Sequence, residues 1–135
     1  MKMTMSENLK RVIVSVAGIP FILISAYLGG YYFLSFVVLV SLMSFYEFSL
    51  LVKHKGANVN LLLGGVVVFV FLLNQFLVFV DLFFIILLSS LALLTFELFR
   101  NKGSAIFNLG STFLGIFYIG IFFAALISLR EFYSN

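Results

Sequence analysis

The sequence has no cysteine, one histidine and only five acidic residues among its 135 positions. Without cysteine, the chain can form no disulfide framework, iron–sulfur cluster or thiolate metal site of its own. The histidine, His54, stands between two lysines, and a single histidine cannot make a metal site. Phosphoryl chemistry needs paired carboxylates and donors that neutralise phosphate, but the acids are scattered and no glycine-rich phosphate loop occurs. We therefore predict no catalytic residue and no metal site in this chain.

Charge is scarce as well, because 10% of the residues are charged and 64% are hydrophobic. A soluble domain is usually nearer half apolar and a quarter charged. The long apolar runs do not alternate with polar residues, as the strands of a membrane barrel would. The net charge of +3 is too small and too dispersed to predict nucleic-acid binding. The composition predicts an all-α integral membrane protein.

Five apolar stretches, separated by short polar or glycine-containing breaks, predict five transmembrane helices in a single transmembrane domain. A polar leader, residues 1–9, precedes the first stretch. No small-residue cleavage pattern follows that stretch, so we interpret it as a retained helix and not as a signal peptide. The predicted helices cover approximately residues 12–28, 31–52, 60–80, 82–99 and 107–129.

Basic residues fall almost wholly on one side of the membrane if these five helices alternate in direction. Cytoplasmic loops carry the excess of lysine and arginine in membrane proteins. The distribution therefore predicts a cytoplasmic amino terminus and a multi-pass protein of the cell (inner) membrane. The bases predicted on the cytoplasmic side are Lys2, Lys10, Arg11, Lys53, Lys55, Arg100 and Lys102, and Arg130 alone falls on the other side.

One acid, Glu47, stands inside the second apolar stretch, about a turn and a half from Lys53. A carboxylate at that depth either reaches the interface and pairs for stability, or lines a polar cavity. Arg11, at the start of the first predicted helix, lies at the same level and is a plausible partner. Both interpretations stay open at this point.

A second acid, Glu97, precedes Arg100 by three residues, which is the helical spacing of a local ion pair. Its surroundings echo those of Glu47, because Phe-Tyr-Glu-Phe at 45–48 and Thr-Phe-Glu-Leu at 95–98 each precede a basic loop. The echo indicates either a repeated helical hairpin or chance similarity between phenylalanine-rich helices.

Polar and small residues indicate where helices meet. Asn74 and Gln75, inside the third predicted helix, favour hydrogen bonds to a neighbouring helix over substrate contact. Small residues recur in four-residue steps on the fifth predicted helix, which predicts a close helix–helix interface. The partner helix stays open, and it could belong to this chain, to a second copy or to helices outside these residues. The small residues are Ser111 and Gly115, then Gly120, Ala124 and Ser128.

Several stretches carry a family resemblance when taken together and in order. They are Asn8-Leu9-Lys10-Arg11-Val12-Ile13, Gly18-Ile19-Pro20 with the later Gly29-Gly30-Tyr31-Tyr32-Phe33, Phe45-Tyr46-Glu47-Phe48, and residues 112–120 ending at Leu129-Arg130. Together they resemble the amino-terminal half of phosphatidate cytidylyltransferase, the CDP-diacylglycerol synthase of bacterial membranes. The resemblance extends over essentially the whole chain.

The resemblance implies an enzyme that transfers a cytidylyl group from CTP to phosphatidate with Mg²⁺ and releases pyrophosphate. The family's Asp-Thr-Gly-Ala-Tyr, Ser-Pro-Lys-Lys-Thr and His-Gly-Gly segments are absent from these residues. We therefore expect the amino-terminal scaffold of a longer enzyme, inactive alone, with Arg11, Glu47 and Lys53 on the wall of a lipid-entry cavity. The expected partners are phosphatidate, CTP, and either missing carboxyl-terminal helices or a second copy packed on the fifth helix. The alternative is a small non-enzymatic multi-pass protein, such as a transporter half or an assembly factor.

Overall fold

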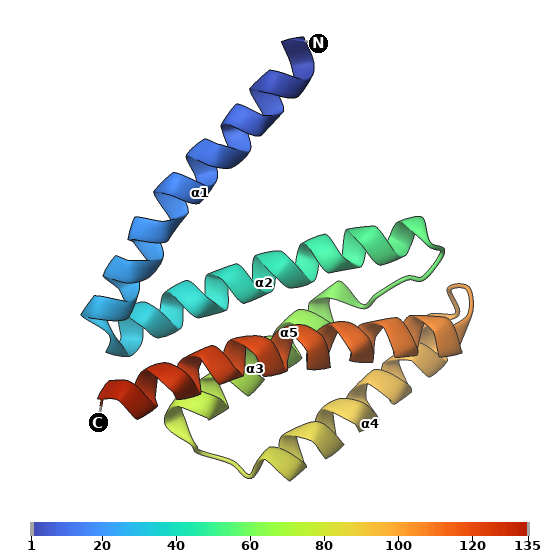
Figure 1. Ribbon diagram of the computed structural model, residues 1–135. Coiled ribbons are helices and arrows are strands. Elements are labelled where there is room, and N and C mark those ends of the chain that lie inside the picture. The colour runs from blue at the N-terminus through green and yellow to red at the C-terminus, as the bar shows by residue number, and fades with distance from the viewer. Residues whose placement is uncertain (1, 135) are drawn as a thin grey trace. The chain divides into compact units, whose positions relative to one another are not determined.

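A computed structural model describes the backbone of residues 2–134 and the side chains of residues 7–133. Within this range the chain forms the five predicted helices (Figure 1). Four of them, α1, α2, α4 and α5, are long and apolar enough to cross a membrane, whereas α3 has only 17 residues. The helices are α1 (Lys2–Leu28), α2 (Gly30–His54), α3 (Leu61–Leu77), α4 (Leu82–Arg100) and α5 (Ala105–Ser134).

The chain divides into two units, residues 1–36 and residues 37–135, which are described separately. The first unit holds α1 and the beginning of α2. The predicted polar leader is wrong, because α1 already begins at Lys2. The leader contains no glycine or proline that would end a helix, and lysine, methionine, glutamate and leucine favour one. The predicted Gly29-Gly30 turn is confirmed, with Gly29 at φ 63° and its N–H bonded to the carbonyl of Ser25 at 3.0 Å.

In the second unit, α2, α3, α4 and α5 follow one another in alternating directions, so that α3 and α5 run the same way (Figure 1). The most extensive helix–helix interface joins α3 and α5, and α4 packs against both. As a result, the loops 55–60 and 101–104 lie at one end of the unit, which we call the basic end. The turn 78–81 lies at the other end. The buried apolar core includes Val37, Phe45, Val68, Leu72, Leu93 and Ile127.

The ring of Phe45 on α2 occupies a slot made by glycines of two other helices. A Cβ at Gly64 of α3 would meet this ring, and a Cβ at Gly115 of α5 would come within 3.0 Å of it. Further along α5, Gly120 faces Phe71, and the Ser128 hydroxyl accepts a hydrogen bond from Gln75 Nε2 at 2.7 Å. The predicted interface on the small-residue face of α5 is confirmed, and at these positions its partners are α2 and α3 of the same chain.

The predicted end of the third helix at Val80 is wrong, because α3 stops at Leu77. Val78 adopts the left-handed conformation (φ 49°), and its N–H bonds to the carbonyl of Asn74. The side-chain oxygen of Asn74 then accepts the N–H of Val80 at 2.9 Å. A side chain that competes for backbone donors in this way ends a helix. Asn74 therefore bonds to its own turn, while Gln75 makes the predicted contact between helices.

Candidate functional site

The three predicted site residues are all exposed, and they lie on two helices. Arg11 lies on α1 in the first unit, whereas Glu47 and Lys53 lie on α2 in the second. Six residues separate Glu47 from Lys53, which is about 9 Å along the helix axis. Their place on the wall of a lipid cavity, and the pairing of Arg11 with Glu47, stay predictions.

A polar cluster that the sequence did not predict lies at the basic end, centred on the carboxylate of Glu97. Only 5% of the Glu97 side chain is exposed. One oxygen, Oε1, accepts a hydrogen bond from Asn108 Nδ2 at 2.7 Å, and the other, Oε2, lies 3.4 Å from Arg100 Nη1. The predicted ion pair with Arg100 is therefore confirmed, but it is one part of a larger network. Because both oxygens have donors, the burial of this carboxylate is compensated.

Asn108 and Arg100 also hold the two loops of the basic end together. Asn108 Oδ1 accepts the backbone N–H of Asn58 at 2.7 Å, and Asn108 Nδ2 donates to the carbonyl of Lys102 at 2.6 Å. Arg100 Nη1 donates to the carbonyl of Asn58 at 2.9 Å. Thus a side chain of α4 and a side chain of α5 satisfy both backbone polar groups of Asn58. The loop 55–60 is fixed against α4 and α5 instead of extending freely.

The beginning of α3 belongs to the same cluster. Asn60 caps this helix by accepting the N–H of Leu63, and its own N–H donates to Thr112 Oγ1 at 3.3 Å. Thr112 in turn donates to the carbonyl of Asn108 at 2.8 Å. Ala57, Val59 and Asn60 are all buried, so the chain enters α3 below the surface of the unit. Irregular backbone at such depth requires protein partners for its polar groups, and the cluster supplies them.

The left-handed conformations of an asparagine and a glycine allow the short loop 101–104 to connect the antiparallel helices α4 and α5. Asn101 (φ 47°) ends α4 in the left-handed region, and Gly103 (φ 69°) follows in the same region. Asparagine and glycine adopt this conformation more readily than other residues. At the start of α5 the Ser104 side-chain oxygen faces the N–H of Phe107 at 3.5 Å, and the Ser104 carbonyl accepts the N–H of Asn108 at 3.0 Å. The short return brings Asn108 back beside Glu97, 11 residues earlier in the chain.

The acids of the described residues do not form a magnesium site. Mg²⁺ prefers several oxygen ligands, usually including carboxylates. Among the side chains of residues 7–133, no three histidines or acids gather where they could hold a metal ion. Both oxygens of the buried carboxylate, Glu97, already accept hydrogen bonds. The residues described here therefore do not fit the Mg²⁺ that the family resemblance implies.

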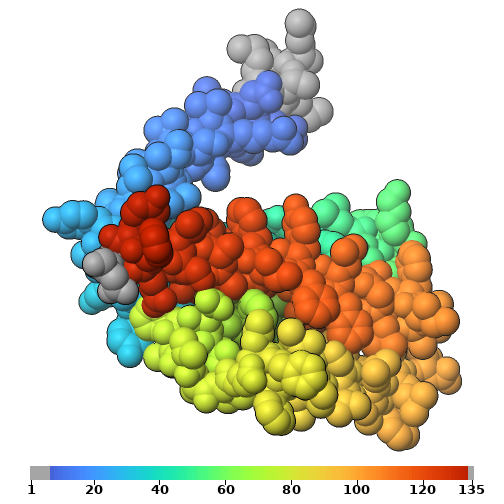
Figure 2. All heavy atoms as spheres, turned by 60° about the horizontal axis from the view of Figure 1, so that its bottom comes forward, coloured from blue at the N-terminus to red at the C-terminus, as the bar shows by residue number. Residues whose placement is uncertain are grey.

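An apolar groove runs between α3 and α4. Figure 2 shows atoms of α3 (lime), α4 (yellow to orange) and α5 (orange to red) packed side by side in the second unit. The groove consists of two hollows that share Leu63 and Ala92, and Arg100 lines it at the basic end. Its wall on α3 is Leu63, Val66, Val67 and Val70, and its wall on α4 is Ile85, Leu88, Ser89, Ala92, Thr95, Phe96, Phe99 and Arg100.

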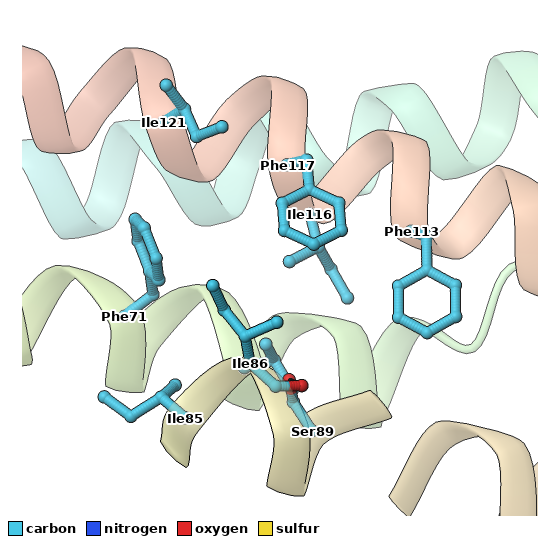
Figure 3. A pocket seen from close by; sticks show the side chains of 9 residues that line it. Phe71, Ile85, Ile86, Ser89, Phe113, Ile116, Phe117 and Ile121 are labelled. Carbon is cyan, nitrogen blue, oxygen red and sulfur yellow. Dashed lines mark hydrogen bonds between the residues drawn. The ribbon is translucent and has the colours of Figure 1, made fainter. Parts of the chain in front are cut away.

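A small pocket beneath this groove lies between α3, α4 and α5 (Figure 3). Phe71 reaches it from α3, Ile85 and Ser89 from α4, and Phe113 and Phe117 from α5. The hydroxyl of Ser89 is the polar side-chain group among the residues lining it, and it donates to the carbonyl of Ile86 at 3.0 Å. The pocket has no group suited to catalysis and serves as an apolar contact between the three helices.

The signals that could have revealed the cluster are weak in the sequence. Asn108 and Thr112 stand four residues apart in an apolar helix, and therefore on one face. That spacing resembles the spacing of the small residues on the same helix, so it also suits simple packing. Asn58 and Asn60 look like ordinary loop residues. No pattern in the sequence links them to Glu97.

The helices define an α-helical protein with the length and apolar character of a membrane protein. The model of the cytidylyltransferase family matches residues 9–134, and the chain belongs to this family. This finding supports the resemblance to phosphatidate cytidylyltransferase seen in the sequence. No curated protein and no solved structure matches the chain.

Proposed function

We propose that this chain forms the membrane scaffold of a CTP:phosphatidate cytidylyltransferase, which makes CDP-diacylglycerol for phospholipid biosynthesis. The observation that carries the proposal is the family match over residues 9–134, nearly the whole chain. CTP and phosphatidate are the substrates that this family assignment implies. The side chains that bind Mg²⁺ and the nucleotide would belong to a part of the enzyme outside this 135-residue sequence, because no suitable carboxylates gather among the side chains of residues 7–133.

In this proposal all five helices cross the cell membrane, with the amino terminus and the basic end in the cytoplasm. The two loops of the basic end and the last turns of α2 and α4 that lead into them carry four of the eight bases, and the Glu97 cluster holds the loops side by side. Lysine and arginine accumulate on the cytoplasmic side of membrane proteins. With 17 residues, α3 has a length of about 25 Å, at the short limit for a spanning helix. The buried residues that precede it extend its path.

Impermeant maleimide labelling tests this orientation, because the chain has no native cysteine. Lys55→Cys lies in a basic-end loop and Phe79→Cys in the opposite turn, and both native side chains are exposed. In intact cells we expect labelling at position 79 and protection at position 55. Inverted vesicles should give the opposite pattern. Labelling of both positions from one side would contradict the proposed topology.

Arg11, Glu47 and Lys53 are proposed to line the cytoplasmic mouth of a lipid-entry cavity. Their exposure leaves them accessible to a lipid headgroup or to further parts of the enzyme. Bases near the membrane surface attract anionic headgroups by about 1 kcal/mol each. Replacing each residue with alanine in an active enzyme should change the affinity for phosphatidate, with a loss of affinity at the two bases, Arg11 and Lys53. Unchanged phosphatidate affinity in all three variants would remove this assignment.

Co-expression tests the scaffold role directly. This chain is combined with the carboxyl-terminal half of a related cytidylyltransferase, in a strain depleted of that enzyme, and CDP-diacylglycerol is measured. We expect activity from the combination and none from this chain alone. The Glu97→Ala chain should fail to restore activity, whereas Glu7→Ala, at an exposed acid of α1, should restore it. If the inserted, stable chain restores no activity, the alternative of a small non-enzymatic membrane protein gains support.

A further inference from the structure

The groove between α3 and α4 is apolar along its length, and Arg100 lines one of its ends. We propose that it holds an acyl chain of an anionic membrane phospholipid whose phosphate binds Arg100. This lipid is a resident component of the protein, separate from the phosphatidate that the proposed reaction consumes. The inference rests on the membrane placement given under the proposed function, and it does not rest on cytidylyl transfer.

The groove has the dimensions of one lipid leaflet. Along α4 it extends from Ile85 to Arg100, and at 1.5 Å per residue this is about 22 Å. Half of a bilayer, with its headgroup region, is roughly 20–22 Å thick. The walls are almost wholly hydrocarbon, and the hydroxyls of Ser89 and Thr95 are turned back onto their own helix carbonyls. Hydrocarbon therefore fills this groove without leaving a polar group unsatisfied.

The arginine at the end of the groove has the geometry to bind a phosphate. Both hydrogen bonds described for Arg100 use Nη1, so Nε and Nη2 remain as donors of the guanidinium fork. The fixed position of Nη1 holds the side chain in place, and 18% of it is exposed. A guanidinium presents parallel donors that match phosphate oxygens. The two oxygens of Glu97 are bound by Nη1 and by Asn108 Nδ2, so this carboxylate does not compete with the phosphate for Nε and Nη2.

Charge at the basic end selects an anionic lipid over a zwitterionic one. Arg100 is balanced by Glu97, but Lys102 is exposed two residues further on and has no acid beside it in sequence. One base near the membrane surface attracts an anionic lipid by about 1 kcal/mol, or roughly fivefold. We therefore expect this degree of enrichment over the bulk membrane.

Tryptophan quenching by brominated lipids can measure the enrichment, because the sequence contains no tryptophan. The reporter is Leu88→Trp in the groove, and the control is Leu114→Trp on the exposed face of α5. The full chain is placed in vesicles of phosphatidylglycerol and phosphatidylcholine in which either lipid carries the brominated chains. Quenching at position 88 should report phosphatidylglycerol enriched about fivefold over the bulk. Quenching at position 114 should report the bulk ratio.

Substitutions in the Leu88→Trp background separate the headgroup contact from the groove. Arg100→Gln should abolish the enrichment because the headgroup loses its phosphate contact, and Lys102→Gln should bring the lipid ratio close to that of the bulk because the uncompensated base is lost. Ala92→Phe, which fills the groove where its two hollows meet, should lower quenching by either lipid. The matched control Ala125→Phe, on the exposed face of α5, should leave quenching unchanged. Ala92→Phe also keeps the proposal testable if Arg100→Gln fails to fold.

The proposal is overturned if both reporters give the bulk ratio or if the enrichment survives Arg100→Gln. Quenching at position 114 without quenching at position 88 overturns it as well, because a protein partner then fills the groove. The measurement needs no enzymatic activity. A chain that enriches lipid but does not complement a cytidylyltransferase would refute the proposed reaction alone. Absence of quenching at both positions would refute the membrane placement together with the lipid site.

Discussion

Two segments that look alike in sequence, 45–48 on α2 and 95–98 on α4, face opposite surroundings in the structure. Each places an acid after an aromatic residue and before a basic loop. Glu97 is 6% exposed and bonded to residues of α4 and α5, whereas Glu47 is exposed. In the first segment the buried residue is Phe45, with 1% exposure. The two segments are therefore similar in sequence, but α2 and α4 bury different faces in the core.

Helical geometry accounts for the difference. Successive residues are rotated by about 100°, so Phe45 and Glu47 point roughly 200° apart, and burial of the ring exposes the acid. Glu97 instead lies four residues after the buried Leu93 and shares its face. A motif that includes an acid near a helix end thus has no fixed role. The face that carries the neighbouring apolar residues decides whether the acid enters the core.

The largest expected difference separates the two acids themselves. Glu97→Ala removes one acceptor from Arg100 and one from the amide of Asn108, each of which keeps a backbone carbonyl, and the loss of these hydrogen bonds to a buried carboxylate should cost about 3 kcal/mol. Glu47→Ala removes an exposed side chain and should change the free energy of unfolding by less than about 0.5 kcal/mol. Reversible unfolding in mixed detergent micelles measures both values. Equal losses in the two variants would contradict the comparison.

The ring of Phe45 gives the second prediction. Gly64→Ala places a Cβ against this enclosed ring, with Cε1 at 2.7 Å, and should cost about 2 kcal/mol through overpacking. Gly110→Ala on α5 is the matched control, because no atom lies within 4 Å of its added Cβ. Alanine favours a helix by up to about 1 kcal/mol over glycine, so this variant should be as stable as the native chain or more so. A stable Gly64→Ala chain would show that the slot is looser than described.

A smaller effect is expected from the hydroxyls of two threonines. Thr112 is 2% exposed and bonds to Asn60 N and to the carbonyl of Asn108, so Thr112→Val should cost about 1 kcal/mol. Thr95 is exposed and bonds only to its own helix, at the carbonyl of Leu91. Thr95→Val should therefore be close to neutral. Thermal unfolding of the Thr112→Val and Thr95→Val variants in detergent tests this difference. Equal losses of stability would show that the loss depends on the residue type and not on the hydrogen bonds of the cluster.

The smallest effect concerns the hydrogen bond at the opposite end of α3 and α5. Gln75→Met removes the donor to Ser128, a contact in the exposed part of the interface. Such hydrogen bonds between membrane helices contribute about 0.6 kcal/mol on average. The free energy of unfolding should fall by that amount, and a double-mutant cycle with Ser128→Ala isolates the coupling. A coupling near 2 kcal/mol would place this contact on a level with the buried cluster.

Helix number and type could be predicted from the sequence, because long apolar runs are a strong signal. The ends that glycines mark, at Gly29 and Gly56, could be predicted as well. The end of α3 could not, since it depends on the Asn74 side chain and on Val78 adopting a left-handed conformation that valine rarely takes. The early start of α1 could not be predicted from hydropathy, because residues 1–9 are polar and only the residues from Val12 onward form an apolar run.

The candidate site was harder to predict for a physical reason. The ion pair of Glu97 with Arg100 follows from local spacing, but Asn58 and Asn108 are 50 residues apart and meet only in the folded unit. Side-chain hydrogen bonds over such separations leave no periodic trace in the chain. Depth and sidedness predict Arg11, Glu47 and Lys53 as site residues, but exposed residues without a function have the same properties. The residues of the Glu97 cluster can be recognised only by their short distances in the folded chain, because no sequence pattern connects them.

The dependence of the α2–α3 loop on α5 has a consequence for biogenesis. The backbone N–H groups of Asn58 and Asn60 bond to side chains that follow 50 and 52 residues later in the chain. At roughly 5–20 residues per second, the ribosome needs about 3–10 s to deliver them. During this interval the loop that leads into α3 has only water, headgroups or the insertion machinery to satisfy those donors. The loop between α2 and α3 thus gains these backbone hydrogen bonds only after Asn108 and Thr112 of α5 have been synthesised, so a later helix completes an earlier one.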